Sequence, residues 1–180
     1  MNILAHDFAA MSAPLLRLNE AKFLLNRFNA SRNVDPNEGL FLLTVYFDSF
    51  LFSLISVEEM VDDQTRAALR AMDSFLFFKA LRNVSTHHSV LSGLHGKFER
   101  PISRKVSIGI GCDVDYSEQF YFIPERLRDV FKQVLAERQG EKWTLAGAGR
   151  YLDALEAAGG DIMVADSASS VVRDVESLIK

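Results

Sequence analysis

Side chains that can handle a phosphate group lie close together in the middle of the chain. The segment Lys79-Ala-Leu-Arg82-Asn83-Val-Ser-Thr-His87-His88 places a guanidinium and two imidazoles within seven residues. An arginine binds phosphate oxygens through a rigid fork of donors, and a histidine gains and loses protons near neutral pH. The segment therefore predicts RNA cleavage without a metal, in which a base deprotonates a 2′-hydroxyl and a cation balances the charge that develops on the phosphate.

In this chemistry Arg82 would bind the scissile phosphate and His87 would transfer the proton, with His88 as the reserve candidate. Asn83 lies four residues before His87 and shares a helical face with it, so its amide could fix the histidine tautomer. Arg82 and His87 are five residues apart, which separates them by about 140° around an ideal helix. Either the helix is kinked or capped between them, or a second subunit completes the site.

The charge of the chain is distributed unevenly. The formal net charge is −4, yet residues 79 to 105 hold six basic residues against one acidic residue, Glu99. A basic segment in an acidic chain can bind a polyanion locally, although a solvated loop is the alternative. The expected substrate-binding residues are Lys79, Lys97, Arg100, Arg104 and Lys105.

Helices are expected to position this segment, because apolar residues recur at helical spacing along most of the chain. The expected helices run from Ser12 to Asn33, Asp35 to Val57, Asp62 or Asp63 to Leu81, Pro124 to Arg138, Thr144 to Ala158 and Ser167 to Ile179. Residues 84 to 94 either continue the third helix or begin another. Between 106 and 112 apolar and small residues alternate, and residues 120 to 123 could pair with them, which predicts a small β-hairpin.

The composition is that of an ordinary globular protein. The chain has 180 residues, 48% of them hydrophobic and 24% charged, which suffices for one core without disulfides or structural metal. Cys112 has no second cysteine, and residues 1 to 16 lack the basic and apolar regions of a secretory signal. The apolar stretch 40–57 contains Asp48, which costs about 2.5–3.5 kcal/mol at a bilayer centre, so a buried helix is expected. These features predict a cytoplasmic protein without a membrane span.

The run Arg82-Asn83-Val84-Ser85-Thr86-His87 resembles the signature of the HEPN superfamily, an arginine and a polar residue followed, after variable positions, by a histidine. The resemblance covers residues 12 to 100, where a long helix, an apolar helix and the helix leading into the run look like a HEPN-like antiparallel helical bundle. The whole chain, 1–180, is expected to be one mainly α domain. Residues 12–100 would form its helical core, 101–123 the β-hairpin insertion and 124–180 additional C-terminal helices.

The resemblance implies a homodimer whose two motifs meet in a shared cleft and cut RNA without metal or cofactor. It further implies a role as a toxin or an antiviral defence protein, with an antitoxin or another protein as partner. Some HEPN toxins carry a tyrosine two residues after the histidine, which a partner enzyme modifies. Here Ser89 stands at that position, so this form of control is not expected.

Other interpretations of the same residues stay open. A non-catalytic HEPN-like module could bind RNA, a nucleotide or a protein partner, and a purely structural subunit is a third possibility. Arg82 could also pair with an acidic neighbour while the histidines are incidental. A metal site using His87, His88 and His95 is disfavoured, because adjacent histidines rarely point at one ion.

Four features outside the motif also need an interpretation. Asp48 is either a core carboxylate paired with an arginine such as Arg82 or a group lining the cleft, and the cost of an unpaired buried carboxylate favours pairing. Gly147-Ala148-Gly149-Arg150 lacks the third glycine of a dinucleotide fingerprint and is expected within a helix. Trp143 and the Phe-rich segments are expected in the core. The apolar stripe of residues 171–179 could pack internally or against another chain.

Overall fold

Seven α-helices make up most of the chain that the structure describes. The computed structural model describes residues 10–30, 36–87, 122–135, 141–159 and 162–179. The helices are α2 (Ala13–Ala30), α3 (Pro36–Met60), α4 (Asp63–Ala71), α5 (Asp73–His87), α7 (Pro124–Leu135), α8 (Lys142–Ala158) and α9 (Val164–Ile179). Within these ranges no strand is formed, and Met163 is the only residue in a β-bridge. The mainly α class is therefore confirmed, and the predicted hairpin lies outside the described residues except for Phe122 and Ile123.

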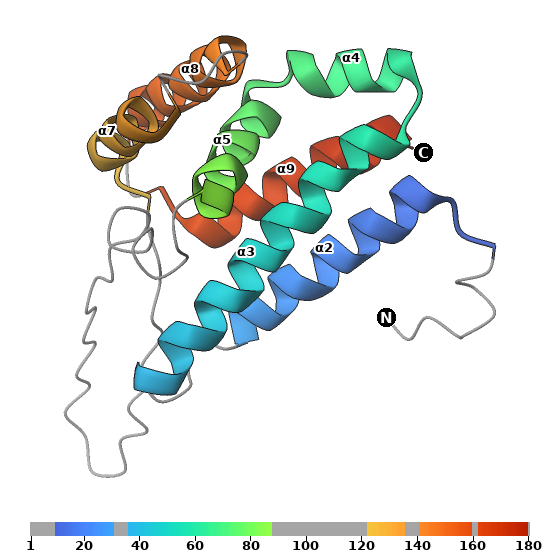
Figure 1. Ribbon diagram of the computed structural model, residues 1–180, viewed down its shortest axis with the longest axis horizontal. Coiled ribbons are helices and arrows are strands. Elements are labelled where there is room, and N and C mark those ends of the chain that lie inside the picture. Colours follow the sequence, from blue (N-terminus) through green and yellow to red (C-terminus); the bar gives the residue numbers. More distant parts are fainter. Residues whose placement is uncertain (1–9, 31–35, 88–121, 136–140, 160–161, 180) are drawn as a thin grey trace.

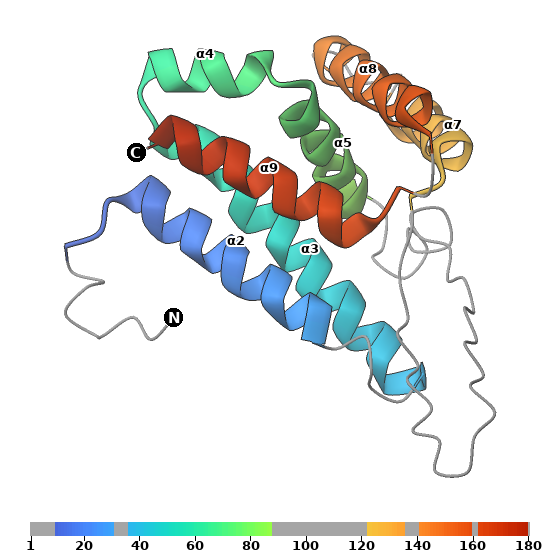
Figure 2. The same ribbon diagram turned by 180° about the vertical axis from the view of Figure 1, so that it is seen from behind.

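Helix α5 lies at the centre of the arrangement. Helices α2 and α3 run antiparallel and side by side, and α9 packs behind them (Figures 1 and 2). Helices α7 and α8 form a separate pair on the other side of α5. As a result α5 contacts α3, α4, α7, α8 and α9, so any group on it is positioned by both halves of the chain.

A cluster of aromatic rings joins α5 to the C-terminal half. Phe77 is fully buried, and its ring centroid lies 5.3 Å from Phe78, 5.1 Å from Phe122, 6.2 Å from Phe131 and 5.1 Å from Tyr151. Three of these pairs are edge-to-face, the geometry that ring quadrupoles favour. The expectation that the Phe-rich segments form the core is confirmed here.

The third predicted helix is in fact two helices. It breaks at Met72, whose backbone is extended with φ −87° and ψ 113°, and whose N–H donates to the carbonyl of Leu69 at 3.1 Å. Asp73 then opens α5 with an acidic first turn, which the helix dipole favours, and both of its carboxylate oxygens accept from Arg150 of α8 at 3.0 and 2.5 Å. Apolar residues keep helical spacing across the break, so periodicity alone gave no sign of it.

Helices α5 and α8 approach closely at Gly147. A Cβ atom added at Gly147 would lie 2.8 Å from Cβ of Leu76 and closer still to its Cδ1, which is nearer than real Cβ contacts allow. Gly149, two residues later in the same helix, has open space around it. The run from Gly147 to Arg150 is therefore a helix feature, as predicted, and its first glycine is required by packing.

The substitution Gly147→Ala is expected to destabilise the fold by about 1–3 kcal/mol, because the new methyl group forces α8 away from Leu76. The matched substitution Gly149→Ala should be neutral or stabilising by up to about 1 kcal/mol, since alanine has the higher helix propensity. Urea unfolding of both variants measures the difference. Equal effects of the two substitutions on the free energy of unfolding would contradict the close approach of α8 to α5 at Gly147.

Helix α3 is a core helix of the bundle. Among the described residues, no helix combines the length and apolarity that a bilayer span requires.

The apolar stripe of α9 packs inside the protein. Val171 and Val175 are fully buried, and Leu178 is more than one-third exposed.

Candidate functional site

The helix that carries the motif continues without a break through His87. Helix α5 spans Asp73–His87, so no helix end or cap separates Arg82 from His87. The two residues are therefore about 140° apart around one helix. Several residues of the predicted site lie outside the described part of the structure. They are the side chain of His87, the whole of His88, and the basic residues Lys97, Arg100, Arg104 and Lys105.

The guanidinium of Arg82 is held by its surroundings on α3 and α5. Arg82 is half-buried, and its Cζ lies 5.2 Å from the centroid of the Phe52 ring, a cation–π contact. Its Nη1 donates to Oδ1 of Asn83 at 3.0 Å. The charged end of Arg82 thus lies between Phe52 of α3 and Asn83 of α5.

Asn83 links Arg82 to helix α8. Its side chain is only 5% exposed, accepts from Arg82, and donates from Nδ2 to Oε1 of Glu141 at 2.9 Å. Glu141 occupies the N-cap position of α8. The described contacts of Asn83 therefore orient Arg82, and the predicted hydrogen bond to His87 involves a side chain that is not described.

Ser85 links α5 to Asp48 of α3 through a hydrogen bond. Ser85 Oγ donates to Oδ1 of Asp48 at 2.9 Å and lies 3.1 Å from the backbone carbonyl of Leu81. Asp48 is half-buried and lines a pocket, which matches one of the two interpretations of this residue. Ser85 has no role in the interpretations drawn from the sequence. Its position one turn after Leu81, on the buried side of α5, is the sequence feature that could have indicated a structural contact.

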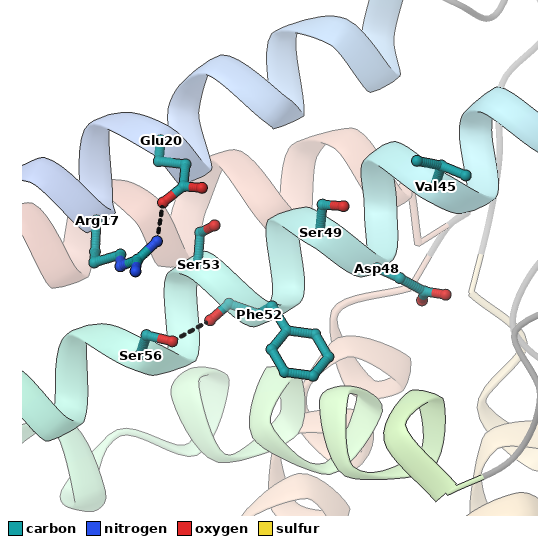
Figure 3. A pocket seen from close by; sticks show the side chains of 8 residues that line it. All are labelled: Arg17, Glu20, Val45, Asp48, Ser49, Phe52, Ser53 and Ser56. Atoms are coloured by element: carbon teal, nitrogen blue, oxygen red, sulfur yellow. Dashed lines mark hydrogen bonds and ion pairs between the residues drawn. The ribbon is translucent and has the colours of Figure 1, made fainter.

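A pocket opens on the surface of α2 and α3. Its volume is about 550 Å³, and residues of both helices line it (Figure 3). Helix α2 contributes Arg17 and Glu20, which form an ion pair at 2.6 Å. Helix α3 contributes Asp48, the hydroxyl groups of Ser49, Ser53 and Ser56, and the half-exposed ring of Phe52. Phe52 therefore lies between the pocket and Arg82.

Lys79 lies in a separate ionic cluster. Glu58 of α3 is buried, and its two carboxylate oxygens accept from Lys79 at 2.5 Å and from Arg70 at 2.6 Å. Both cations also lie over the ring of Trp143, with Lys79 Nζ at 4.8 Å and Arg70 Cζ at 5.7 Å from its centroid. Trp143 is 39% exposed, so the prediction that it lies in the core is wrong. The cation–π contacts with α4 and α5 stabilise its surface position.

Glu58→Gln is expected to destabilise the protein by about 1.5–3 kcal/mol at neutral pH, because charge-assisted hydrogen bonds are lost. Burial raises the pKa of Glu58, but the hydrogen bonds from Lys79 and Arg70 outweigh it, so the pKa lies below the ordinary 4.5. A lowered folded-state pKa contributes stability above pH 4.5 that is lost as pH falls through the folded value. The wild type and Glu58→Gln should therefore converge in stability below pH 4.5.

Thermal unfolding across this pH range tests the expectation, with the exposed neighbour substitution Glu59→Gln as control. Glu59→Gln should change stability by less than about 0.5 kcal/mol. If the difference in stability between wild type and Glu58→Gln stayed constant from neutral to acid pH, the stabilising role of the ionised Glu58 carboxylate would be refuted.

No protein-family model, curated protein or solved structure matches the chain. In the described ranges, no three histidine, cysteine or acidic side chains gather in a way that could hold a metal ion.

Proposed function

We propose that this protein is a metal-independent endoribonuclease of HEPN type that acts as a homodimer. Arg82 binds the scissile phosphate, and His87 acts as general acid or base, with His88 as the alternative histidine. The observation that carries the proposal is the fixed position of the Arg82 guanidinium between Phe52 and Asn83. A donor group held in place before the reaction stabilises developing charge without the cost of reorganisation.

The continuity of α5 supports the dimer in this proposal. Because the helix is continuous, positions 82 and 87 of one chain are about 140° apart around its axis. In a twofold dimer, Arg82 of one subunit can meet His87 of the other, and the symmetry then creates two equivalent sites. Asn83 acts as a positioning residue that fixes the arginine through Glu141.

The resemblance to HEPN proteins supplies the proposed biological setting, which is a toxin or an antiviral defence protein with an antitoxin or other partner. The rival is a non-catalytic module of the same type that binds RNA or a nucleotide. The pocket of about 550 Å³ favours this rival as the second candidate, because it has the size of a small-ligand site.

Turnover separates the two functions. The full-length protein is incubated with single-stranded RNA in EDTA, and the products are analysed by electrophoresis and end-group chemistry. Attack of a 2′-hydroxyl on the adjacent phosphate predicts fragments with 2′,3′-cyclic phosphate and 5′-hydroxyl ends. RNA that stays intact at high protein concentration, but is bound, would favour the binding module.

A further inference from the structure

A partly exposed indole lies beside two cations that come from α4 and α5. Trp143 of α8 is 39% exposed, and Lys79 Nζ and Arg70 Cζ lie 4.8 and 5.7 Å from its ring centroid. Both cations bind the buried carboxylate of Glu58, which fixes their positions beside the ring. Trp143 is therefore held in place on the surface, while more than a third of it stays open to a ligand.

The cations around the indole can still bind an anion. Nε of Arg70 donates to Glu58 at 2.6 Å, whereas none of the described hydrogen bonds uses its Nη1 or Nη2, and the side chain is 51% exposed. Lys142, in the first turn of α8, is exposed as well. With Lys79 they make three cations, against the two carboxylates of Glu58 and Glu141. An aromatic ring flanked by guanidinium donors and net positive charge suits an unpaired nucleotide, whose base stacks and whose phosphate accepts hydrogen bonds.

The indole lies close to the residue proposed to bind the scissile phosphate. Lys79 and Arg82 are three residues apart on α5, and residues at this spacing are neighbours on the surface of a helix. Asn83, which accepts from Arg82, donates to Glu141, two residues before Trp143. An RNA strand with a phosphate at Arg82 can therefore place a flanking nucleotide at Trp143.

We propose that Trp143 and Arg70 form a second contact for the RNA strand, in which an unpaired base stacks on the indole and Arg70 binds an adjoining phosphate. The choice of RNA as the ligand rests on the proposed function. Every base has a flat π-face, so this contact strengthens the binding of single strands without reading their sequence. In a duplex the bases are stacked on one another and paired, so the ring cannot reach them. The surface therefore selects single-stranded over double-stranded RNA.

Trp143 is the single tryptophan of the chain, so its fluorescence reports on this surface directly. The full-length protein is titrated with a short single-stranded RNA whose 2′-hydroxyls are methylated, which prevents the proposed cleavage. Binding should quench the fluorescence of Trp143, because a base stacks on the indole. An abasic strand with the same number of phosphates, and the duplex of the same sequence, should quench it less. If the single strand binds, as anisotropy of a labelled end would show, and the tryptophan fluorescence stays unchanged, the inference is overturned.

Trp143→Ala should weaken binding of the single strand about five- to 150-fold, the effect of losing one stacked base. Trp143→Phe keeps an aromatic ring, so its affinity should lie closer to the wild type than to Trp143→Ala. Phe23→Ala is the matched control, because it also removes an exposed ring beside a cation, Arg27, and it should leave the affinity unchanged. Equal affinities of the wild type and Trp143→Ala would overturn the stacking contact.

The salt dependence of binding tests the phosphate contact of Arg70. Arg70→Gln should make the slope of log affinity against log salt concentration shallower by about 0.7, the value for one phosphate contact of a single strand. Arg173→Gln, on the exposed surface of α9, is the matched control and should keep the wild-type slope. A wild-type slope in Arg70→Gln would refute the role of Arg70. If that variant does not fold, the abasic strand and the Trp143 variants still decide on the stacked base.

These measurements involve no cleavage, so they separate the inference from the nuclease proposal. If the wild type cuts RNA and Trp143→Ala binds single strands normally, the nuclease stands and the stacking surface is overturned. If the wild type cuts no RNA, but single strands quench Trp143 and bind weakly to Trp143→Ala, the nuclease fails and the surface is supported. A wild type that binds no single strand overturns the surface.

Discussion

Arg82→Ala and His87→Ala are each expected to lower the rate of RNA cleavage at least about 10²-fold, and His87→Ala by up to about 10⁴-fold. In the proposed mechanism Arg82 supplies a preorganised cation, and its loss leaves the charge that develops on the phosphate without a counterpart. His87 supplies the proton transfer in the same mechanism. Single-turnover cleavage of a short RNA in EDTA measures both effects.

Controls keep these effects separate from folding. Arg173→Ala removes an exposed arginine on α9, away from the site, and should leave the rate within about twofold of the wild type. His88→Ala decides between the two histidines, because a loss as large as that of His87→Ala would move the catalytic role. Circular dichroism and thermal unfolding confirm that each variant keeps its helices.

Mixing the two inactive variants tests whether the site is shared between subunits. In a dimer of one Arg82→Ala and one His87→Ala chain, one site combines an intact arginine with an intact histidine from the other chain. Random exchange makes half of the dimers mixed, and each has one of two sites, so about a quarter of the wild-type activity should return. If both residues of one chain formed a site together, mixing would restore nothing. That result would refute the composite site, even if the wild type cleaves RNA.

The continuous helix α5 shows what sequence periodicity could and could not predict. Its apolar residues, Phe75, Phe77, Phe78 and Leu81, are all buried, as their spacing indicated. The break at Met72 was missed because the apolar spacing runs through it. Asp73, directly after the break, pairs with Arg150 of α8, and such a contact between distant parts of the chain leaves no periodic signal.

The sequence singled out the central residue of the proposed site but not its surroundings. The motif drew attention to Arg82 through residue type and spacing, whereas for Asp48 the sequence favoured pairing with an arginine over lining a cleft. The contacts that position them, Phe52 under the guanidinium and Glu141 behind Asn83, come from other helices far along the chain. Lys79 was expected to bind substrate from its charge alone, whereas the structure places it against the buried Glu58. A formal charge in a sequence does not show which cations already have a partner.

Phe77→Ala is expected to destabilise the protein by about 3–5 kcal/mol, the largest effect on folding that the structure predicts. Phe77 is fully buried and contacts rings from α5, α7 and α8 and from the segment before α7, so truncation would leave a cavity that several elements must share. Phe23→Ala on α2 is the matched control, because that ring is 55% exposed and its contact with Arg27 is a surface contact. It should cost less than about 1 kcal/mol.

Urea unfolding measures how much each variant lowers the free energy of unfolding, and similar losses in both variants would contradict the aromatic core.

A comparison of Phe77→Ala with Arg82→Ala also separates stability from catalysis, because Phe77 and Arg82 lie on the same helix. Phe77→Ala should lose stability but cleave RNA at a near-normal rate per folded molecule at low temperature. Arg82→Ala should show the reverse, with a stable fold and little cleavage. If Phe77→Ala lost cleavage as completely as Arg82→Ala while still folded, the rate would depend on the packing of α5 as a whole, and the specific role given to the Arg82 guanidinium would be refuted.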